Sequence, residues 1–381
     1  MSRVQLKDVA LAAGVRPSVV SAALNNRSFT RISAERRSYI CALAAQMGYV
    51  PSLEAASLRK GQTAAVGVFL PSWNDVLLLE LIRGFSAGSS QYPVPLAYFF
   101  GLSSSSYQSF ISSMVNYRHT ALISYVPAGE QDYDQTISLL QKYMREGGKV
   151  LSLNNQPYMM QNTISVDIDE GAGGRLAAEY LAGFPSLRSI LLVSIDGALF
   201  NMREKAFCQC FAEAGKPVEK LRFKLLCHSN SEQVRRELVQ RLLSMPKPVG
   251  IFFTSSELYS VFLLLSEEMR WRLGQDYQVV SYDLPSQLDG CHFIPRIAQP
   301  FYQLGVEAVK TMSGLLQKKR MKSMTLQPWL CESLEAYRLY QQETQPGLLD
   351  YGIENKEVKK ACQHINKSVV PGRGVEIHGA G

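Results

Sequence analysis

From residue 65 onward, short apolar segments alternate with longer segments in which apolar residues recur every three or four positions. Short apolar runs indicate buried strands, and the longer spacing indicates amphipathic helices. The pattern predicts strands at 65–71, 94–100, 121–126, 149–153, 189–194, 221–227, 249–254 and 278–282. It predicts helices at 78–90, 107–117, 136–146, 172–182, 201–214, 232–244 and 257–269. Such alternation is typical of parallel α/β sheets, so we expect two doubly wound lobes with ligand sites at the carboxyl ends of their strands.

The first 50 residues have a different pattern, which predicts three short helices. The first covers Leu6–Ala13 and is followed by Gly14, a turn residue, and the second covers Pro17–Asn25. Ser33 is a suitable N-cap for the third helix, which Gly48 ends. Two short helices around a glycine turn, braced by a third, predict a helix-turn-helix, a unit that places its second helix in the DNA major groove.

Charge separates the same two regions. The chain has 381 residues, enough for two or three domains, with 46% hydrophobic residues, 19% charged residues and a formal net charge of +7. Residues 1–61 hold nine basic and three acidic side chains, a net charge of +6, so the other 320 residues carry a net charge of +1. A basic head on a near-neutral body indicates an anionic polymer as the partner of the head, although a solvated charged surface is the alternative.

Several classes of protein are disfavoured by the sequence. The longest apolar runs are too short to span a membrane, and the N-terminus lacks the apolar segment of a signal peptide, so we expect a soluble, cytoplasmic protein. The seven cysteines are scattered without Cys-x-x-Cys spacing, and the five histidines form no metal-binding pattern. No nucleophile–base set or phosphate-binding loop is present in the sequence. We therefore expect neither an enzyme nor a cofactor.

Three segments of the head resemble the lactose/galactose-repressor (LacI/GalR) family of bacterial transcription regulators. They are Leu6-Lys-Asp-Val-Ala-Leu-Ala-Ala-Gly-Val15, Val19-Val-Ser-Ala-Ala-Leu-Asn25 and Met47-Gly-Tyr-Val-Pro51. The resemblance implies that residues 51–63 form a hinge helix and linker, with Leu58 inserted into the minor groove as an apolar wedge. The alternative role for Leu58 is packing within a helix.

The same resemblance implies which residues contact DNA. Alanine stands at position 22, where the family often has arginine, and Arg16 either replaces that base contact or binds a phosphate. The expected contacts come from the first helix, the recognition helix with its flank, and the hinge: Leu6, Arg16, Pro17, Ser18, Ser21, Ala22, Asn25, Arg27, Ser57, Leu58 and Arg59.

The body also resembles this family, whose regulatory core is similar to periplasmic sugar-binding proteins. Motifs occur in the family's order at 67–71, 166–177, 203–207, 278–283 and 297–305. Arg203 and Asp283 correspond to two polar anchors of the family's effector, and each can hold paired hydroxyl groups. A surface ion pair or a helix cap is the alternative for each. The full set of expected effector contacts is Trp73, Asp75, Leu77, Arg203, Ser256 and Asp283.

Three of these positions depart from the family pattern. Leu77 and Leu78 replace an aromatic pair that often stacks on a sugar, and Asp75 stands where asparagine is usual. Ser255-Ser256-Glu257 replaces an Asn-Asp pair. The departures argue against an ordinary hexose effector but do not argue against an effector cleft.

The expected fold class is a small all-α helix-turn-helix head, joined by a hinge helix to an α/β core of two doubly wound parallel-sheet lobes, similar to periplasmic binding proteins. The predicted domains are the head at 1–50, the hinge at 51–63, a first lobe at 64–166 plus 296–323, and a second lobe at 167–295 plus 324–336. The tail at 337–381 receives no function; it either adds a helix near 351–366 or stays disordered.

The leading functional prediction is a transcriptional regulator, most simply a repressor, that acts as a homodimer on a palindromic double-stranded DNA operator. A small-molecule effector, sugar-like or nucleoside-like, would control it from the cleft between the lobes. One alternative is a DNA-binding regulator with a degenerate cleft and no effector. Another is a small-molecule binding protein or enzyme whose head is incidental.

Overall fold

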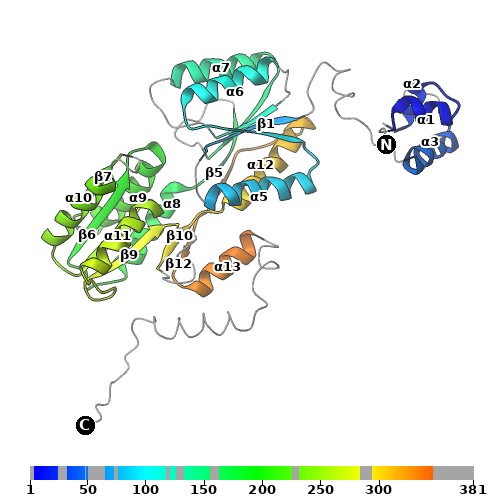
Figure 1. Cartoon of the computed structure of the whole chain (residues 1–381). Helices are drawn as coiled ribbons and strands as arrows, with labels where there is room; N and C mark the ends of the chain where they lie inside the picture. The colour runs from blue at the N-terminus through cyan, green and yellow to red at the C-terminus, as the bar shows by residue number, and fades with distance from the viewer. Residues whose placement is uncertain are drawn as a thin grey trace, which may run out of the picture. The chain divides into compact units, whose positions relative to one another are not determined.

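The computed structural model of the chain describes residues 4–24, 32–47, 49, 65–72, 76–116, 121–125, 133–154, 163–224, 231–283 and 294–345. The chain divides into two compact units, Met1–Ala64 and Ala65–Gly381 (Figure 1). Each unit is described by itself. None of the helices in the described ranges combines the length and the apolar character needed to cross a membrane.

The first unit contains the three predicted helices. They are α1 (Leu6–Ala12), α2 (Pro17–Leu24) and α3 (Ala34–Gln46), joined around a small core that includes Val9, Val20 and Ile40. Gly14 adopts a φ of +61°, which L-residues rarely adopt, and so allows the tight turn between α1 and α2. The Ser33 side chain accepts a hydrogen bond from the Arg36 amide at 3.2 Å and caps α3, as the sequence predicts.

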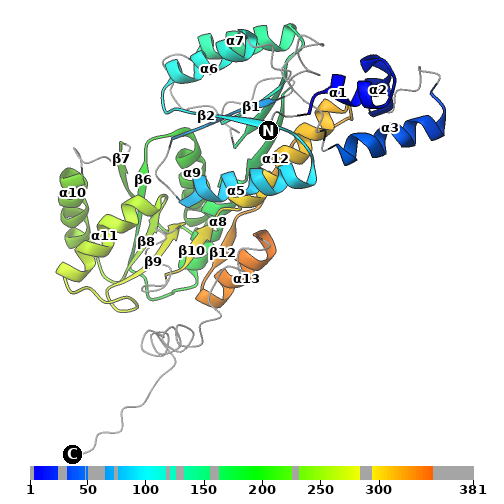
Figure 2. The same ribbon diagram turned by 45° about the vertical axis from the view of Figure 1, so that its right-hand side comes forward.

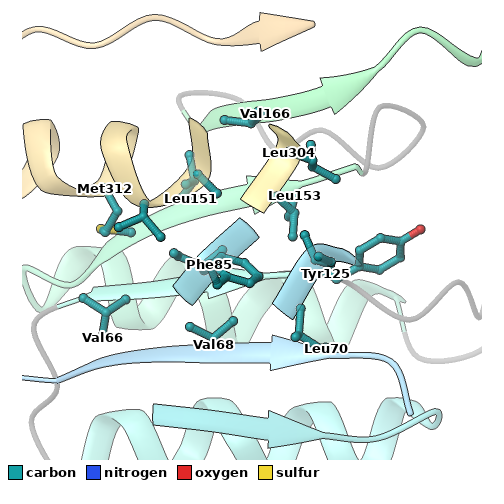
Figure 3. Close-up of a cluster of buried hydrophobic side chains, with 14 of the residues drawn as sticks. Val66, Val68, Leu70, Phe85, Tyr125, Leu151, Leu153, Val166, Leu304 and Met312 are labelled. Carbon is teal, nitrogen blue, oxygen red and sulfur yellow. The ribbon is translucent and has the colours of Figure 1, made fainter. Parts of the chain in front are cut away.

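The first lobe of the second unit is a six-stranded parallel sheet in the order β11-β5-β4-β3-β1-β2. Helices α5 and α12 cover one face, and α6 and α7 cover the other. Figure 3 shows Phe85, Leu304 and Met312 packed with strand residues such as Val68 and Leu151. The strands are β1 (Val66–Leu70), β2 (Leu96–Phe100), β3 (Ala121–Ser124), β4 (Lys149–Leu153), β5 (Ile164–Ile168) and β11 (Met324–Leu326); the helices are α5 (Val76–Gln91), α6 (Ser104–Asn116), α7 (Tyr133–Arg145) and α12 (Phe301–Leu316).

The second lobe is a six-stranded sheet in the order β12-β10-β9-β8-β6-β7, parallel except for β12. Helices α8 and α9 cover one face, α10 and α11 cover the other, and α13 packs beside β12. The strands are β6 (Ser189–Ile195), β7 (Glu219–Phe223), β8 (Val249–Phe253), β9 (Tyr277–Tyr282), β10 (Arg296–Ala298) and β12 (Trp329–Cys331); the helices are α8 (Glu170–Ala182), α9 (Ala198–Glu213), α10 (Ser231–Ser244), α11 (Ser256–Glu268) and α13 (Leu334–Thr344).

The strand pairing corrects the lobe boundaries predicted from sequence. The chain crosses between lobes after β5, after β10 and after β11. Residues 167–168 therefore belong to the first lobe, residues 296–298 to the second and residues 324–326 to the first, the reverse of the prediction in each case. The strands involved have three to five residues, too few for an apolar pattern to show which sheet they join.

The predicted tail at 337–381 also begins too early. Helix α13 continues to Thr344, and Tyr340 and Thr344 are buried in it. The helix expected near 351–366 lies outside the described residues. The strand expected at 221–227 is found at Glu219–Phe223, and Cys227 is likewise not described.

Backbones of α5 and α12 lie in direct contact in the first lobe. A Cβ atom added at Gly84 would overlap the Tyr302 carbonyl oxygen, and one added at Gly305 would meet the backbone of Leu81 and Phe85. Only glycine permits this approach, because any larger residue would separate the two helices. The packing matters for the rest of the molecule because α12 directly follows the connection from β10, residues 299–300, where the chain passes from the second lobe to the first. This connection is called the crossover below.

We therefore expect Gly84→Ala to lower the free energy of unfolding by about 1–3 kcal/mol, the usual cost of overpacking a core. Gly171→Ala in helix α8 is the matched control. A Cβ atom added at Gly171 would have its nearest neighbours at 3.4 Å, which is an ordinary van der Waals contact. Urea unfolding measures both variants. Equal unfolding midpoints for Gly84→Ala and Gly171→Ala would contradict the backbone contact.

Candidate functional site

The start of α2 forms an exposed surface on the first unit. The Arg16 carbonyl accepts hydrogen bonds from the amides of Val19 at 2.9 Å and Val20 at 3.4 Å, so Arg16 directly precedes the first helical turn. The side chains of Arg16, Pro17 and Ser18 are exposed. A helix N-terminus flanked by a cation suits an anionic partner such as a phosphate backbone.

The other predicted DNA contacts of the first unit have different positions. Ser21 is half-buried, and Leu6 is half-buried against the core of the unit. Ala22 is 5% exposed, which corrects the expectation that it faces DNA. The buried stripe of α2 includes Ala22 as well as Val20 and Ala23, and a small apolar residue gives no sequence signal of which side it faces. Five further predicted contacts lie outside the described residues: Asn25, Arg27, Ser57, Leu58 and Arg59.

In the second unit, Arg203 lies at the centre of a buried polar network at the carboxyl ends of the strands. Its side chain, carried by α9, is 6% exposed. The Nε atom donates to Glu170 Oε2 at 2.6 Å, Nη1 donates to the Thr254 carbonyl at 2.7 Å, and Nη2 donates to Gln299 Oε1 at 3.1 Å. The guanidinium also lies 3.7 Å from the centre of the Tyr282 ring, a cation–π contact.

This environment raises the pKa of Arg203. Burial by itself would lower the pKa, because it disfavours the charged form, but the electrostatic effects of Glu170, Tyr282 and Asp283 and the hydrogen bond to Glu170 together outweigh burial. Arg203 is therefore a permanent buried cation whose charge Glu170 neutralises. The burial of Arg203 does not fit its alternative as a surface ion pair, and its place in an effector cleft between the lobes stays a prediction.

Gln299 joins the two residues that the sequence singled out as effector anchors. Its Nε2 atom donates to Asp283 Oδ2 at 2.6 Å, while its Oε1 accepts from Arg203. The backbone N–H of Gln299 also donates a hydrogen bond to Asp283 Oδ1 at 3.1 Å. Arg203 and Asp283 thus lie on either side of one amide side chain. Sequence reasoning missed this role, although a polar residue directly before Pro300 at the crossover was a usable signal.

A small cavity adjoins this network. Leu77 and Asp283, two of the predicted effector residues, both line it. Its volume of about 10 Å³ is room for one water molecule. The cavity is lined by both lobes, the crossover and α13, through Val76, Leu77, Glu80, Asp283, Arg296, Ala298, Gln299, Tyr337 and Tyr340. Sequence reasoning predicted none of Glu80, Arg296, Tyr337 and Tyr340 as an effector contact, although Arg296 directly precedes the motif at 297–305.

The first lobe reaches the network through Tyr125, at the end of β3. Burial raises the pKa of Tyr125, and the negative charge of Glu170 in the second lobe raises it further. The Asn154 side chain donates to the Tyr125 hydroxyl at 3.4 Å. Polar groups of both lobes therefore converge at one place.

Three predicted effector contacts lie elsewhere or are not described. Ser256 is half-exposed at the start of α11, where its carbonyl accepts a hydrogen bond from Ser260 Oγ, and it does not line the cavity. Trp73 and Asp75 lie outside the described residues. Among the residues that the structure does describe, no group of three potential metal ligands lies together.

We expect Arg203→Met to lower the free energy of unfolding by about 3–5 kcal/mol, because it leaves Glu170 as an unpaired buried charge. Arg175→Met is the matched control: Arg175 pairs with Asp169 at 3.6 Å, and its side chain is 52% exposed. The control should change stability by less than about 1 kcal/mol, since exposed ion pairs contribute little. Urea unfolding distinguishes the two variants, and a small effect of Arg203→Met would disprove the buried pair.

Comparison with known proteins adds an independent line of evidence. Residues 5–52 match the family described as "Bacterial regulatory proteins, lacI family". The ribose operon repressor of Bacillus subtilis is 25% identical over 336 residues, which covers 84% of this chain and 94% of that protein. The HTH-type transcriptional repressor PurR of Erwinia tasmaniensis is 25% identical over 331 residues, covering 84% and 93%.

Among solved structures, a Lac repressor dimer bound to operator and the anti-inducer ONPF matches with a TM-score of 0.69. The identity is 20%, and the match covers 87% of this chain and 98% of that chain. At this identity the match supports the fold: a helix-turn-helix head followed by two parallel-sheet lobes. The head of this chain therefore contains a helix-turn-helix that matches the lacI family of bacterial regulatory proteins over residues 5–52, and the whole chain has the fold of the Lac repressor.

Proposed function

We propose that this protein is a sequence-specific transcriptional repressor whose affinity for its DNA operator is controlled by a small sugar-like effector bound between the two lobes. The exposed first turn of α2, within a head that matches the lacI family, is the observation that carries the DNA-binding part. The relatives' names support the regulatory part, because they are repressors of a ribose operon and of the PurR type.

The effector part rests on the convergence of polar groups at the carboxyl ends of the strands, where ligands of such sheets bind. Arg203, Asp283 and Gln299 supply hydrogen-bond donors and acceptors suited to hydroxyl groups, and Leu77 supplies an apolar surface. A ligand that binds one arrangement of the lobes more tightly would shift the protein toward that arrangement and so change operator affinity. Two heads on a homodimer would read a palindromic site.

A second candidate is a repressor that needs no effector. The cavity next to the network has room for one water, and Gln299 already fills the space between Arg203 and Asp283. In that case, the protein's own side chains would permanently satisfy the polar groups that a sugar would otherwise bind.

Selection of bound duplexes from a randomised DNA library tests the DNA-binding part. We expect enrichment of one palindromic sequence by the full chain at low salt, and no enrichment would refute sequence-specific binding. D-ribose, sucrose and cellobiose are then added to the complex. These sugars appear in the names of two curated relatives and of one solved structure with a similar fold. Release of DNA, together with thermal stabilisation of about 2.7 kcal/mol at one hundred times the dissociation constant, supports effector control. No response to any of the three favours the effector-independent candidate.

We expect Arg16→Ala to weaken binding to the selected duplex by about tenfold, within the range of roughly 1–3 kcal/mol for a lost base contact. The loss should concentrate at one base pair in each half-site. Arg175→Ala, an exposed arginine of the second unit, serves as the control and should bind normally. Arg16 would instead be a phosphate contact if affinity fell equally for every DNA sequence. In that case the slope of log affinity against log salt concentration should become shallower by about one.

A further inference from the structure

Helix α13 lies beyond the last motif of the sequence analysis, yet it packs against the crossover between the lobes. Ser333 caps its start by accepting a hydrogen bond from the Ala336 amide at 3.1 Å. Tyr340, 1% exposed, packs with Ala298 of β10 and Cys331 of β12. Figures 1 and 2 both show α13 beside β10 and β12. The helix is therefore part of the folded body.

The Tyr340 hydroxyl donates a hydrogen bond of 2.7 Å to the Gln299 carbonyl. The same carbonyl accepts from the Phe301 amide, at the first residue of α12 in the other lobe. The side chain of Gln299 meanwhile holds Arg203 and Asp283. One residue thus connects α13, the crossover and both predicted effector anchors.

The surroundings keep Tyr340 protonated. Burial raises the pKa of Tyr340 well above its ordinary value, and the negative charges of Glu80 and Asp283 raise it further. Glu80 belongs to α5 of the first lobe, so α13 faces residues from both lobes. Tyr337, one turn earlier, covers the Arg296 guanidinium at 4.1 Å. The hydroxyl remains a hydrogen-bond donor throughout the physiological pH range.

We propose that α13 is a third wall of the effector pocket, and that Tyr340 is a positioning residue that sets Gln299 and, through it, Arg203 and Asp283. This proposal extends the proposed function to a segment outside both lobes' helix–strand repeats. Glu80 and Asp283 offer carboxylate acceptors, and Arg296 offers donors, while Leu77 and the tyrosine rings offer apolar faces. This lining suits an uncharged polyhydroxyl ligand with one apolar face.

The closed state of the pocket follows from the same contacts. A cavity of about 10 Å³ cannot hold a sugar, so its walls must separate for a ligand to bind. Separation of α13 from the crossover breaks the bond between Tyr340 and Gln299. That hydrogen bond therefore favours the closed pocket, and its removal should make the pocket easier to open.

Tyr340→Phe tests the proposal in the full chain, because it removes the hydroxyl and keeps the ring. Amide hydrogen exchange at Gln299 and Phe301 should become about fivefold faster, the effect of one ordinary hydrogen bond. Tyr98→Phe is the matched control, since Tyr98 lies on edge strand β2 and is 37% exposed. Equal exchange in the two variants would overturn the positioning role.

A double-mutant cycle with Arg203→Lys separates positioning from simple packing. Lysine keeps the charge but lacks the planar fork that reaches Gln299 and Thr254. If Tyr340 acts on Arg203 through Gln299, the exchange rates of the double variant should differ by at least about threefold from the product of the single effects. Independent effects, which simply multiply, would show that α13 only covers the crossover.

The functional arm uses D-ribose, sucrose and cellobiose as probes of operator release. For the sugar that releases DNA from the wild-type chain, Tyr340→Phe should lower the half-releasing concentration by about fivefold. Tyr98→Phe should leave it unchanged, and equal values for the two variants would contradict the proposal. If none of the three sugars releases DNA, the result favours the effector-independent candidate for the function. The exchange rates and the cycle, measured without DNA or sugar, then still decide whether Tyr340 positions the network.

Discussion

The buried charge of Arg203 is the constraint on which the arrangement of the site depends. A guanidinium in a low-dielectric interior needs a counter-charge and hydrogen-bond acceptors in several directions, because an unpaired buried charge costs several kcal/mol. Glu170, Thr254 and Gln299 supply these acceptors, and they lie 33, 51 and 96 residues away from Arg203 in the sequence. The fold of the second lobe must therefore bring the start of α8, the end of β8 and the crossover after β10 to a single point.

The crossover connects this network to the first lobe. Gln299 directly precedes Pro300, the N-cap of α12, and α12 packs backbone to backbone on α5. A movement of the lobes that turned α12 would displace Gln299, and with it the partners of Arg203 and Asp283. Gln299 therefore gives a physical route by which a ligand could change the arrangement of the lobes. The affinity of the ligand would differ between two positions of Gln299, so binding would favour one of them. Helix α13 adds a further contact, because the Tyr340 hydroxyl donates a hydrogen bond to the Gln299 carbonyl.

Sequence patterns were reliable where an element was long and had one buried face. The three head helices and the amphipathic helices of both lobes appear close to their predicted bounds, because apolar periodicity over ten or more residues has few alternative explanations. The patterns failed for β10, β11 and β12, whose three residues carry no periodicity and whose sheet membership depends on distant partners. They failed for Ala22 because a small side chain is compatible with either face of a helix. Arg203 and Asp283 were predicted as effector contacts from the resemblance to a family's motifs, whereas the Gln299 side chain that joins them was not predicted.

By itself, the sequence determined the local properties of this protein: a basic head with three short helices, and a near-neutral body of alternating strands and helices. These properties follow from neighbours along the chain, through capping, glycine turns and apolar periodicity. Only the tertiary structure decided which polar side chains meet, because Glu170, Arg203, Asp283, Gln299 and Tyr340 come from five separate segments. Their contacts depend on strand order and on where the chain crosses between sheets. Long-range pairing sets both, and short local patterns do not record it.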